Sequence, residues 1–559
     1  MNKYDFIILG AGSAGCVLAN RLSENPEFSV CLIEAGSKDK DPRLHIPIGF
    51  AFLGDKTKYN WAYETEPQKE FAKVTVEEPE AAVVDSAGGV HKVPSTSEDH
   101  RRGYQPRGKT LGGSSSINAM LYVRGHKWDY DHWADLGNEG WSYKDVLPYF
   151  IKAEHNEEHD NEFHGKNGPL NVSEIRHKNR FVDDFVKAGS SLYKFNEDFN
   201  GEDQEGFGFY QTTQKDGKRC SAAKAYIVPA LERDNLTVLT DTNVNKILIE
   251  NNSATGVECI DSNNETITLN ASKEVILSSG AFGSPQILLR SGIGPENEIT
   301  KHGIEHLVDL PGVGKNLQDH IDILTVHKYN AMDLIGFSLK SIFYKFPLEI
   351  LKYIFKKTGM FTSTIAEGGA FIKTRDDLEI PNIQLHYAPA MVIDHGRTSV
   401  WGHGMSCHSC LLRPKSRGEV TLKSSDPFDD PSIDPKFLSH PDDMQDMIDG
   451  YKKMMEVLNT EPFTKYIKEH TQTPIDVNND KEIEQVLRAE ADTVYHPVGT
   501  CKMGNDDMSV VDSNLKVRNV NGLRVVDASI MPTLIGGNTN APTIMIGEKA
   551  SDLIKSDWS

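Results

Sequence analysis

The chain has few cysteines, no excess of basic residues and no long apolar run, and each shortage excludes a class of protein. Its seven cysteines in 559 residues are an odd number without the spacing of a disulfide framework, so we expect reduced thiols, as in the cytosol. The 60 lysines and arginines against 81 acids give a formal net charge of −21, which argues against a general nucleic-acid binder. No run of 18 apolar residues is present, so we expect no membrane-spanning helix. The first predicted strand starts too near Met1 to leave room for a cleavable signal, and a cytoplasmic location is expected.

The most informative pattern lies close to the N-terminus and is typical of dinucleotide binding. A short apolar run at residues 6–9 predicts a strand buried on both faces, and it ends in Gly10-Ala-Gly12-Ser-Ala-Gly15. A helical pattern and a second apolar strand follow, and that strand ends in Glu34. Gly10 allows the tight turn, Gly12 lets the backbone approach a pyrophosphate, Gly15 lets the helix pack on the strand, and Glu34 can accept hydrogen bonds from ribose hydroxyls. This pattern fits NAD and FAD equally well.

The remainder of the chain favours a two-domain flavoprotein over an NAD enzyme. Residues 236–279 read as four or five short strands separated by Asn, Asp and Gly turns, which predicts an antiparallel meander where an NAD domain would continue its alternation of strands and helices. Residues 70–100 lack periodicity and carry seven acids against two lysines, which predicts a surface insertion or flexible flap. The lone Cys407-His-Ser-Cys410 lies in a strand-like stretch and is expected to be part of a strand, with no metal site predicted.

Five further motifs make the chain resemble the glucose–methanol–choline (GMC) oxidoreductases over essentially its whole length. In chain order they are GKTLGGSSSINAMLYVRG (108–125), SGAFGSPQILLRSGIG (279–294), PGVGKNLQDH (311–320), YHPVGTCKMG (495–504) and GGNTNAPTIMIGEKASDLI (536–554). The resemblance implies FAD as cofactor and a mixed α/β (α+β) fold, in which a Rossmann-like FAD-binding domain carries an inserted antiparallel-sheet substrate domain. Within the family the chain looks nearest to bacterial FAD-dependent primary alcohol dehydrogenases, with choline dehydrogenases close behind.

The same resemblance implies how the two domains share the chain. The FAD-binding domain would comprise residues 1–155, with the insertion at 70–100, together with residues 206–312 and 488–559. The substrate domain would comprise residues 156–205 and 313–487.

The resemblance also places the flavin. Some family members link FAD covalently through a histidine just before the motif asparagine, and Ile117 occupies that position here, so non-covalent FAD is expected. The residues expected to bind the cofactor are Gly10, Gly12, Ser13, Ala14, Gly15, Glu34, Ala35, Trp61, Gly112, Gly113, Ser114, Asn118, Ala119, Val244, Ala281, Asp527, Ala528, Asn538 and Thr539.

Two residues are expected to carry the chemistry. Oxidation of an alcohol by flavin needs a base for the hydroxyl proton, and the family's catalytic histidine falls at His496; the alternative is a structural loop histidine. Asn540 can donate a hydrogen bond to the alcohol oxygen but cannot take a proton, and it could also serve as the N-cap of the last helix. His320 is expected to be structural. Glu367 could pair with a quaternary ammonium, which would favour choline, although its motif, Ala366-Glu367-Gly-Gly369, also occurs in aliphatic-alcohol enzymes of the family.

The leading prediction is therefore FAD-dependent oxidation of a primary, aliphatic alcohol to the aldehyde, with hydride transfer to flavin N5 and electrons passed to a quinone or another non-NAD acceptor. Choline dehydrogenase is the first alternative, and an oxygen-using oxidase of the same family is the second. An NAD-linked dehydrogenase and a non-catalytic flavin-binding protein are the readings from other classes; the meander argues against the first and the intact His496/Asn540 pair against the second.

Residues 338–357 stand apart from the acidic remainder of the chain. They hold five lysines against one glutamate, interleaved with Phe343, Tyr344, Phe346, Tyr353 and Phe355. Such a segment predicts that the protein binds peripherally to anionic lipid headgroups at the inner face of the cytoplasmic membrane, near a quinone pool. The alternative is that the aromatic side chains pack inside the substrate domain and the lysines are merely solvated.

Overall fold

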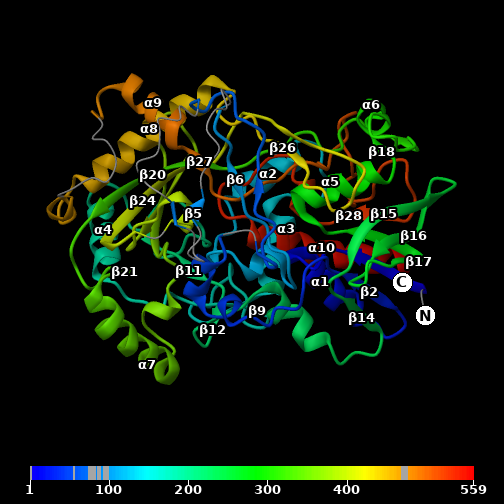
Figure 1. Ribbon diagram of the computed structural model, residues 1–559, viewed down its shortest axis with the longest axis horizontal. Helices are drawn as coiled ribbons and strands as arrows, with labels where there is room; N and C mark the ends of the chain where they lie inside the picture. The colour runs from blue at the N-terminus through cyan, green and yellow to red at the C-terminus, as the bar shows by residue number, and fades with distance from the viewer. Residues whose placement is uncertain are drawn as a thin grey trace.

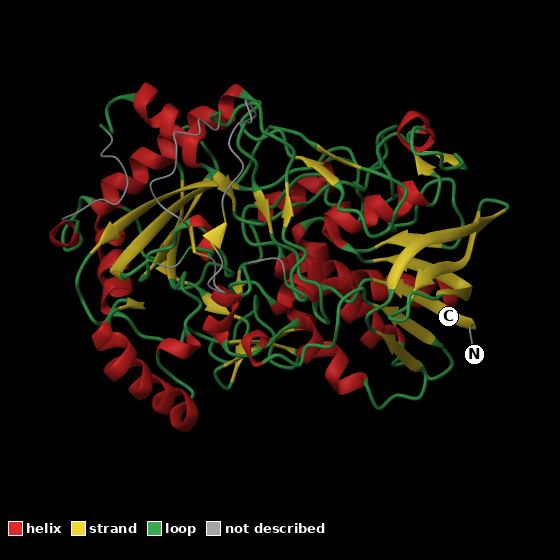
Figure 2. Ribbon diagram, viewed as in Figure 1, coloured by secondary structure: helices red, strands yellow, loops and turns green. Residues whose placement is uncertain are grey.

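The computed structural model describes residues 3–54, 57–73, 83–84, 90–91, 100–398, 400–467 and 476–559. Two large sheets organise the molecule, one at each end of its long axis (Figures 1 and 2). Each sheet has its own buried apolar cluster. The expected mixed α/β architecture is confirmed. Most of the insertion expected at 70–100 lies outside the described residues.

The first sheet combines a parallel part with an antiparallel ribbon. The neighbour order is β14-β2-β1-β17-β16-β15, and β28 also pairs with β17. The strands are β1 (Lys3–Leu9), β2 (Val30–Ile33), β14 (Leu236–Leu239), β15 (Asn243–Glu250), β16 (Ser253–Ile260), β17 (Thr266–Leu277) and β28 (Leu523–Val525). Of the predicted meander, β15, β16 and β17 are antiparallel, but β14 pairs parallel with β2. β14 therefore supplies the third parallel strand that is missing directly after Glu34.

The parallel strands are apolar throughout because helices cover them. Residues 6–9 of β1 and all of β2 are buried, as the continuous apolar runs predict. Helix α1 (Ser13–Leu22) packs against the C-terminal helix α10 (Asn540–Trp558) beside this sheet. The Arg21 guanidinium donates two hydrogen bonds of 2.8 Å to the buried Glu548 carboxylate, which ties the two helices together. The first and last segments of the chain are thus one structural unit.

The second sheet is antiparallel. Its neighbour order is β10-β22-β23-β24-β20-β27, with β21 also paired to β24. The strands are β10 (Gly206–Phe209), β20 (Ile321–Lys328), β21 (Gly336–Phe337), β22 (Gly368–Ile372), β23 (Ile383–Ala388), β24 (Gly402–Leu411) and β27 (Asp492–Thr493). Helices α4 (Arg180–Leu192), α8 (Pro441–Leu458) and α9 (Asp480–Glu490) complete its apolar cluster. Cys407 and Cys410 lie on β24, which confirms that stretch as a strand. β10 and β27 fall outside the stretches expected for the substrate domain, and the domain boundaries stay predictions.

The other elements connect or flank these sheets. The helices are α2 (Lys127–Asp135), α3 (Tyr143–Ala153), α5 (Gly280–Arg290), α6 (Glu296–Thr300) and α7 (Phe346–Lys356). The short strands are β3 (Tyr63–Glu64), β4 (Val83–Val84), β5 (Val90–His91), β6 (Tyr104–Gln105), β7 (Leu121–Tyr122), β8 (Glu154–Asn156), β9 (Leu170–Val172), β11 (Gln211–Thr212), β12 (Gln214–Lys215), β13 (Lys218–Arg219), β18 (Ile293–Gly294), β19 (Val308–Asp309), β25 (Glu419–Thr421) and β26 (Ser432–Asp434). Within the described ranges, no helix is both long and apolar enough to cross a bilayer.

Candidate active site

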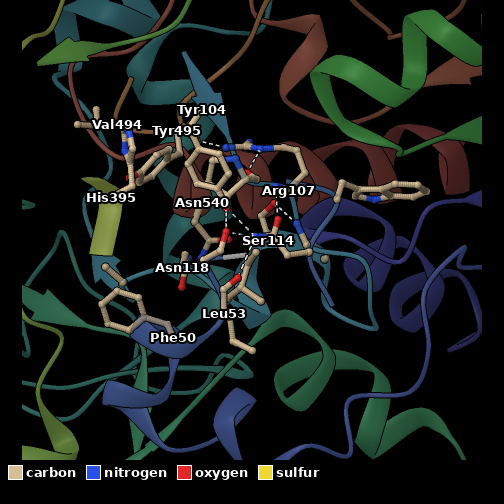
Figure 3. Close-up of a pocket in the computed structure, with 18 of the residues that line it drawn as sticks. Phe50, Leu53, Tyr104, Arg107, Ser114, Asn118, His395, Val494, Tyr495 and Asn540 are labelled. Carbon is tan, nitrogen blue, oxygen red and sulfur yellow. Dashed lines mark hydrogen bonds between the residues drawn. The ribbon is translucent and has the colours of Figure 1, made fainter. Parts of the chain in front are cut away.

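A cavity of about 1000 Å³ extends from the carboxyl ends of the parallel strands to the antiparallel sheet. It is lined by residues of the glycine-rich turn after β1, of the 113–121 segment, of the loop after β27 and of the start of α10. Figure 3 shows Ser114, Asn118 and Asn540 close together in it, beside Arg107 and Tyr495. Residues more than 500 positions apart in the chain, Ser13 and Asn540, meet here: the Ser13 hydroxyl donates a 2.7 Å hydrogen bond to the Asn540 amide oxygen.

Close backbone approach requires glycine at positions 10 and 15 around the turn after β1, and at position 113 opposite it. Gly10 has φ +103°, and a Cβ there would lie 2.5 Å from the Ser278 carbonyl oxygen. A Cβ on Gly113 would lie 2.8 Å from the Gly12 Cα, so the two glycine-rich segments touch through bare backbone. Gly15 does not line the cavity; a Cβ there would lie 1.9 Å from the Gly10 carbonyl oxygen, which is the helix–strand packing role expected of it.

Glu34 closes this end of the cavity. Its Oε2 accepts a 2.9 Å hydrogen bond from the Ala11 amide and its Oε1 a 2.8 Å hydrogen bond from the Gly36 amide. Burial raises the pKa of the carboxyl to about 7. Each carboxylate oxygen has a second acceptor site, so Glu34 can also accept from the hydroxyls of a ribose. A helix N-terminus, bare glycine backbone and a strand-end acid in one cavity fit the phosphates and ribose of a dinucleotide such as FAD.

Nearly all residues expected to bind the cofactor line this one cavity. They are Gly10, Gly12, Ser13, Ala14, Glu34, Ala35, Trp61, Gly113, Ser114, Asn118, Ala119, Val244, Ala281, Asp527, Ala528, Asn538 and Thr539. Gly112 does not line the cavity, and its amide instead donates to the Ala11 carbonyl at 2.8 Å. Ile117 is on the cavity wall and offers no nitrogen for a covalent link. Cofactor contacts at these positions stay predictions.

The two histidines His320 and His496 form a buried pair whose hydrogen bonds fix their tautomers. The His320 Nε2 lies 3.0 Å from the Leu412 carbonyl oxygen, which can only accept, so Nε2 carries the proton. Burial lowers the pKa of His320 to about 3, so the ring is neutral and its Nδ1 is an acceptor. The His496 Nδ1 lies 2.9 Å from that Nδ1 and therefore donates to it. The lone pair of His496 then resides on Nε2, where it accepts from the Asn538 amide nitrogen at 3.2 Å.

Burial keeps His496 in its proton-accepting form. The pKa of His496 is lowered well below its usual range by desolvation, and nearby His320, His386 and Arg107 lower it further. Its backbone is held as firmly as its ring, because the Asp319 Oδ1 accepts the His496 amide at 2.8 Å. His496 lines the cavity, as does Asn540. The expectation that His320 is structural is therefore incomplete, because its ring orients the ring of His496.

Asp319 and Arg107 form the scaffold behind the histidines. The Asp319 Oδ2 accepts from the Gln105 amide at 2.8 Å and from the Thr493 hydroxyl at 2.6 Å, and burial raises the pKa of this carboxyl to about 6. The Arg107 guanidinium donates to the Tyr495 carbonyl at 2.6 Å. These three contacts fix Asp319 and Tyr495, the residues directly around His496.

Asn540 lines the cavity, whereas Glu367 does not. Asn540 is the first residue of α10, and Thr539 precedes the helix, so Asn540 is not its N-cap. Glu367 is fully buried: its Oε1 accepts from the Ser363 hydroxyl at 2.6 Å and lies 2.8 Å from the His177 Nδ1. Glu367 does not line the cavity, in contrast to the neighbouring Ala366.

Comparison with known proteins identifies the family. The N-terminal and C-terminal sequence models of the GMC oxidoreductases match residues 4–322 and 414–547. The chain belongs to the GMC oxidoreductase family. Membership implies FAD and makes the chain an oxidoreductase that acts on CH–OH donors.

Among curated relatives, this GMC oxidoreductase is 45% identical over 554 residues to an alcohol dehydrogenase [acceptor] of Pseudomonas putida, covering 99% of this chain and 95% of the relative. It is 39% identical over 560 residues to an oxygen-dependent choline dehydrogenase of Escherichia coli, covering 99% and 96%. Among solved structures, a formate oxidase of Aspergillus oryzae superposes with a TM-score of 0.87 at 26% identity, covering 100% and 98%.

Proposed function

We propose that this GMC oxidoreductase oxidises a primary, aliphatic alcohol to the aldehyde with non-covalently bound FAD, and that His496 is the base. The observation that carries the proposal is the tautomer of His496. Its Nδ1 proton is committed to His320, so the free lone pair of the ring is on Nε2, and His496 is among the residues that line the cavity. The relationship to the alcohol dehydrogenase [acceptor] at 45% identity supports the substrate class.

The chain's own residues would position the alcohol and hold its proton. The alcohol hydroxyl would replace the Asn538 amide as hydrogen-bond donor to His496 Nε2 and lose its proton there. The Asn540 amide nitrogen would donate to the alcohol oxygen, since its amide oxygen is already bound by Ser13. Bound FAD would supply the acceptor for the hydride that leaves the α-carbon. Gly10, Gly12 and Glu34 would hold its phosphates and ribose.

Choline is the second candidate substrate, since the chain is 39% identical to an oxygen-dependent choline dehydrogenase. Glu367 is the acid that would pair with a quaternary ammonium, but it faces His177 and Ser363 and is absent from the cavity wall. This placement favours an uncharged alcohol over choline. The electron acceptor we propose is a quinone or another non-NAD acceptor.

A substrate panel tests the proposal. Purified enzyme would be assayed anaerobically with a dye acceptor on straight-chain primary alcohols of increasing length, on secondary alcohols and on choline, and then with oxygen or a soluble quinone in place of the dye. We expect the highest kcat/KM for primary aliphatic alcohols and faster turnover with quinone than with oxygen. A preference for choline would replace the substrate assignment, and equal turnover with oxygen would make the protein an oxidase.

A further inference from the structure

An exposed apolar ridge lies between residues 339 and 355. It consists of the side chains of Leu339, Ile342, Phe343, Tyr344, Leu348, Ile350, Leu351, Ile354 and Phe355. Phe343 and Tyr344 are each 75% exposed and Phe355 is 79% exposed, so these aromatic residues do not pack inside the substrate domain. In Figures 1 and 2, α7 projects from the edge of the molecule at the end that carries the antiparallel sheet. Exposed apolar side chains that are gathered on one surface in this way mark an interaction site.

In helix α7 the charged side chain of Glu349 faces the protein and most of the apolar side chains face solvent, which is the reverse of an ordinary surface helix. Glu349 is buried, and its carboxylate accepts the Met360 amide at 2.8 Å and the Lys352 ammonium at 2.5 Å. Ile350 and Ile354 are four positions apart, as are Leu351 and Phe355, so the two pairs share the outward face. At 1.5 Å per residue, the 11 residues of α7 span ~16 Å, about half of a ~30 Å hydrocarbon core, so such a helix would lie on a bilayer.

The charge around the ridge selects an anionic partner. Five lysines and one glutamate occur at residues 338–357, in a chain whose formal net charge is −21. Lys340 and Lys356 are exposed beside the ridge, as is Lys352, which is paired with Glu349. A two-fold dimer through this surface would place the lysines of both copies against each other, which like-charge repulsion disfavours. Anionic headgroups meet the lysines and acyl chains meet the apolar side chains.

The ridge adjoins the mouth of the active-site cavity. Phe346 of α7 lines the cavity, and so do Phe337 before the ridge and Phe361 after it. Phe52 lines the cavity too and is 59% exposed. Trp401, which is 62% exposed, is bridged to Phe337 through the backbone. The apolar surface is therefore continuous with an aromatic entrance to the cavity.

We propose that the ridge docks on the surface of an anionic membrane and places the cavity mouth at the bilayer, so that an apolar alcohol enters the site directly from the lipid. Only the identity of the substrate rests on the proposed function. The docking itself rests on the exposed side chains and the lysines.

Vesicle sedimentation of the FAD-loaded enzyme tests the docking. The vesicles would be phosphatidylcholine alone or an equimolar mixture with phosphatidylglycerol, each at low salt and in about 1 M salt, where the Debye length is ~3 Å. The apolar variant is Phe343→Ser/Phe355→Ser and the charge variant is Lys340→Gln/Lys356→Gln, which leaves the Lys352–Glu349 pair intact. The matched control is Phe195→Ser/Leu231→Ser, whose side chains are 54% and 53% exposed elsewhere on the chain.

We expect wild type and control to bind the anionic vesicles at low salt and to bind phosphatidylcholine weakly. The affinity of the apolar variant for the anionic vesicles should fall by about tenfold or more, and the affinity of the charge variant should fall by about tenfold. Failure of the wild type to sediment, or unchanged binding by the apolar variant, would overturn the docking. A concentration-dependent dimer that the apolar variant dissociates would assign the ridge to a second copy instead.

Activity separates this inference from the proposed function. Oxidation of a short, water-soluble alcohol with a dye should be the same in all variants, since none of the substituted residues lines the cavity. Oxidation of a long-chain alcohol dissolved in the vesicles should fall in parallel with binding. If no alcohol is oxidised, the proposed function is wrong while sedimentation still decides the docking. If binding falls but the rate with the lipid-dissolved alcohol does not, entry from the bilayer is wrong.

Discussion

Replacing His320 by leucine should slow the reaction without removing the base. Leucine fills a similar volume but cannot accept a hydrogen bond from the His496 Nδ1, which lies 2.9 Å from the His320 Nδ1 in the wild type. His496 would be left with a buried N–H without a partner and would be free to shift its proton to Nε2. An unsatisfied buried donor costs ~1–3 kcal/mol. If the activation free energy rises by that amount, the rate falls roughly 5-fold to 150-fold.

Asparagine is the informative comparison at this position. Its γ-amide places an oxygen near the site of the His320 Nδ1, so His320→Asn keeps an acceptor for His496 and loses only the contact with the Leu412 carbonyl. Flavin reduction by alcohol, followed anaerobically in a stopped-flow instrument, measures the affected step directly. We expect leucine to be slow, asparagine to be nearer to wild type, and both variants to retain bound FAD.

A double-substitution cycle distinguishes orientation of His496 from a general packing role. If His320 acts through His496, then His320→Leu should change the rate by less than about twofold when His496 is already alanine, because interacting residues are not additive. Equal losses from His320→Leu in both backgrounds, or a wild-type rate in the single variant, would refute the tautomer assignment.

Three further outcomes follow from the site. His496→Ala should keep FAD and lose ~10²-fold or more in flavin reduction, with a smaller loss for Asn540→Ala, which removes one hydrogen bond; a near-wild-type rate in His496→Ala would exclude it as the base. Acid precipitation should release the flavin into the supernatant, because Ile117 cannot form a covalent link; coloured pellet would contradict this. Burial lowers the pKa of His386 to about 3, below the ~6.5 of an unfolded histidine, so the unfolded state binds the proton more readily and stability falls as pH drops below ~6.5. His386→Asn should therefore lose ~2 kcal/mol less than wild type between pH 8 and pH 5 in urea unfolding, and identical losses would show that His386 does not titrate in this way.

The parts of the site that the sequence reveals are those whose residues are close together in the chain. The glycines, the helix and the strand-end acid of the first 36 residues form one local unit, and Gly15 packs against Gly10 as their spacing predicts. The pairing of β14 with β2 was not predictable in this way. More than 190 residues separate the two strands, and β14 has the same apolar pattern as the meander strands that follow it.

The role of His320 depends on the register between two strands. β20 and β27 pair antiparallel with Ile321 opposite Thr493, so the residue before β20 meets the loop that follows β27. That register brings His320 to His496, 176 positions away. β27 has only two residues and no alternating pattern, so the sequence gives no sign of the pairing. A family motif identifies His496, but only the fold shows what holds its ring.

The two groups proposed to touch the alcohol are held by different halves of the molecule. Asn540 is fixed by Ser13 of the glycine-rich turn, so its position follows the site for the cofactor. His496 is fixed by Asp319 and His320, at the edge of the antiparallel sheet. Asn538 contacts both sides: its amide nitrogen is 3.2 Å from the His496 Nε2, and its amide oxygen accepts from Gln384 of β23 at 3.2 Å. Because the proposed base and the proposed cofactor site are held by separate halves, their alignment depends on how the two sheets meet across the cavity, and Asn538 bridges the two halves until an alcohol takes its place at His496.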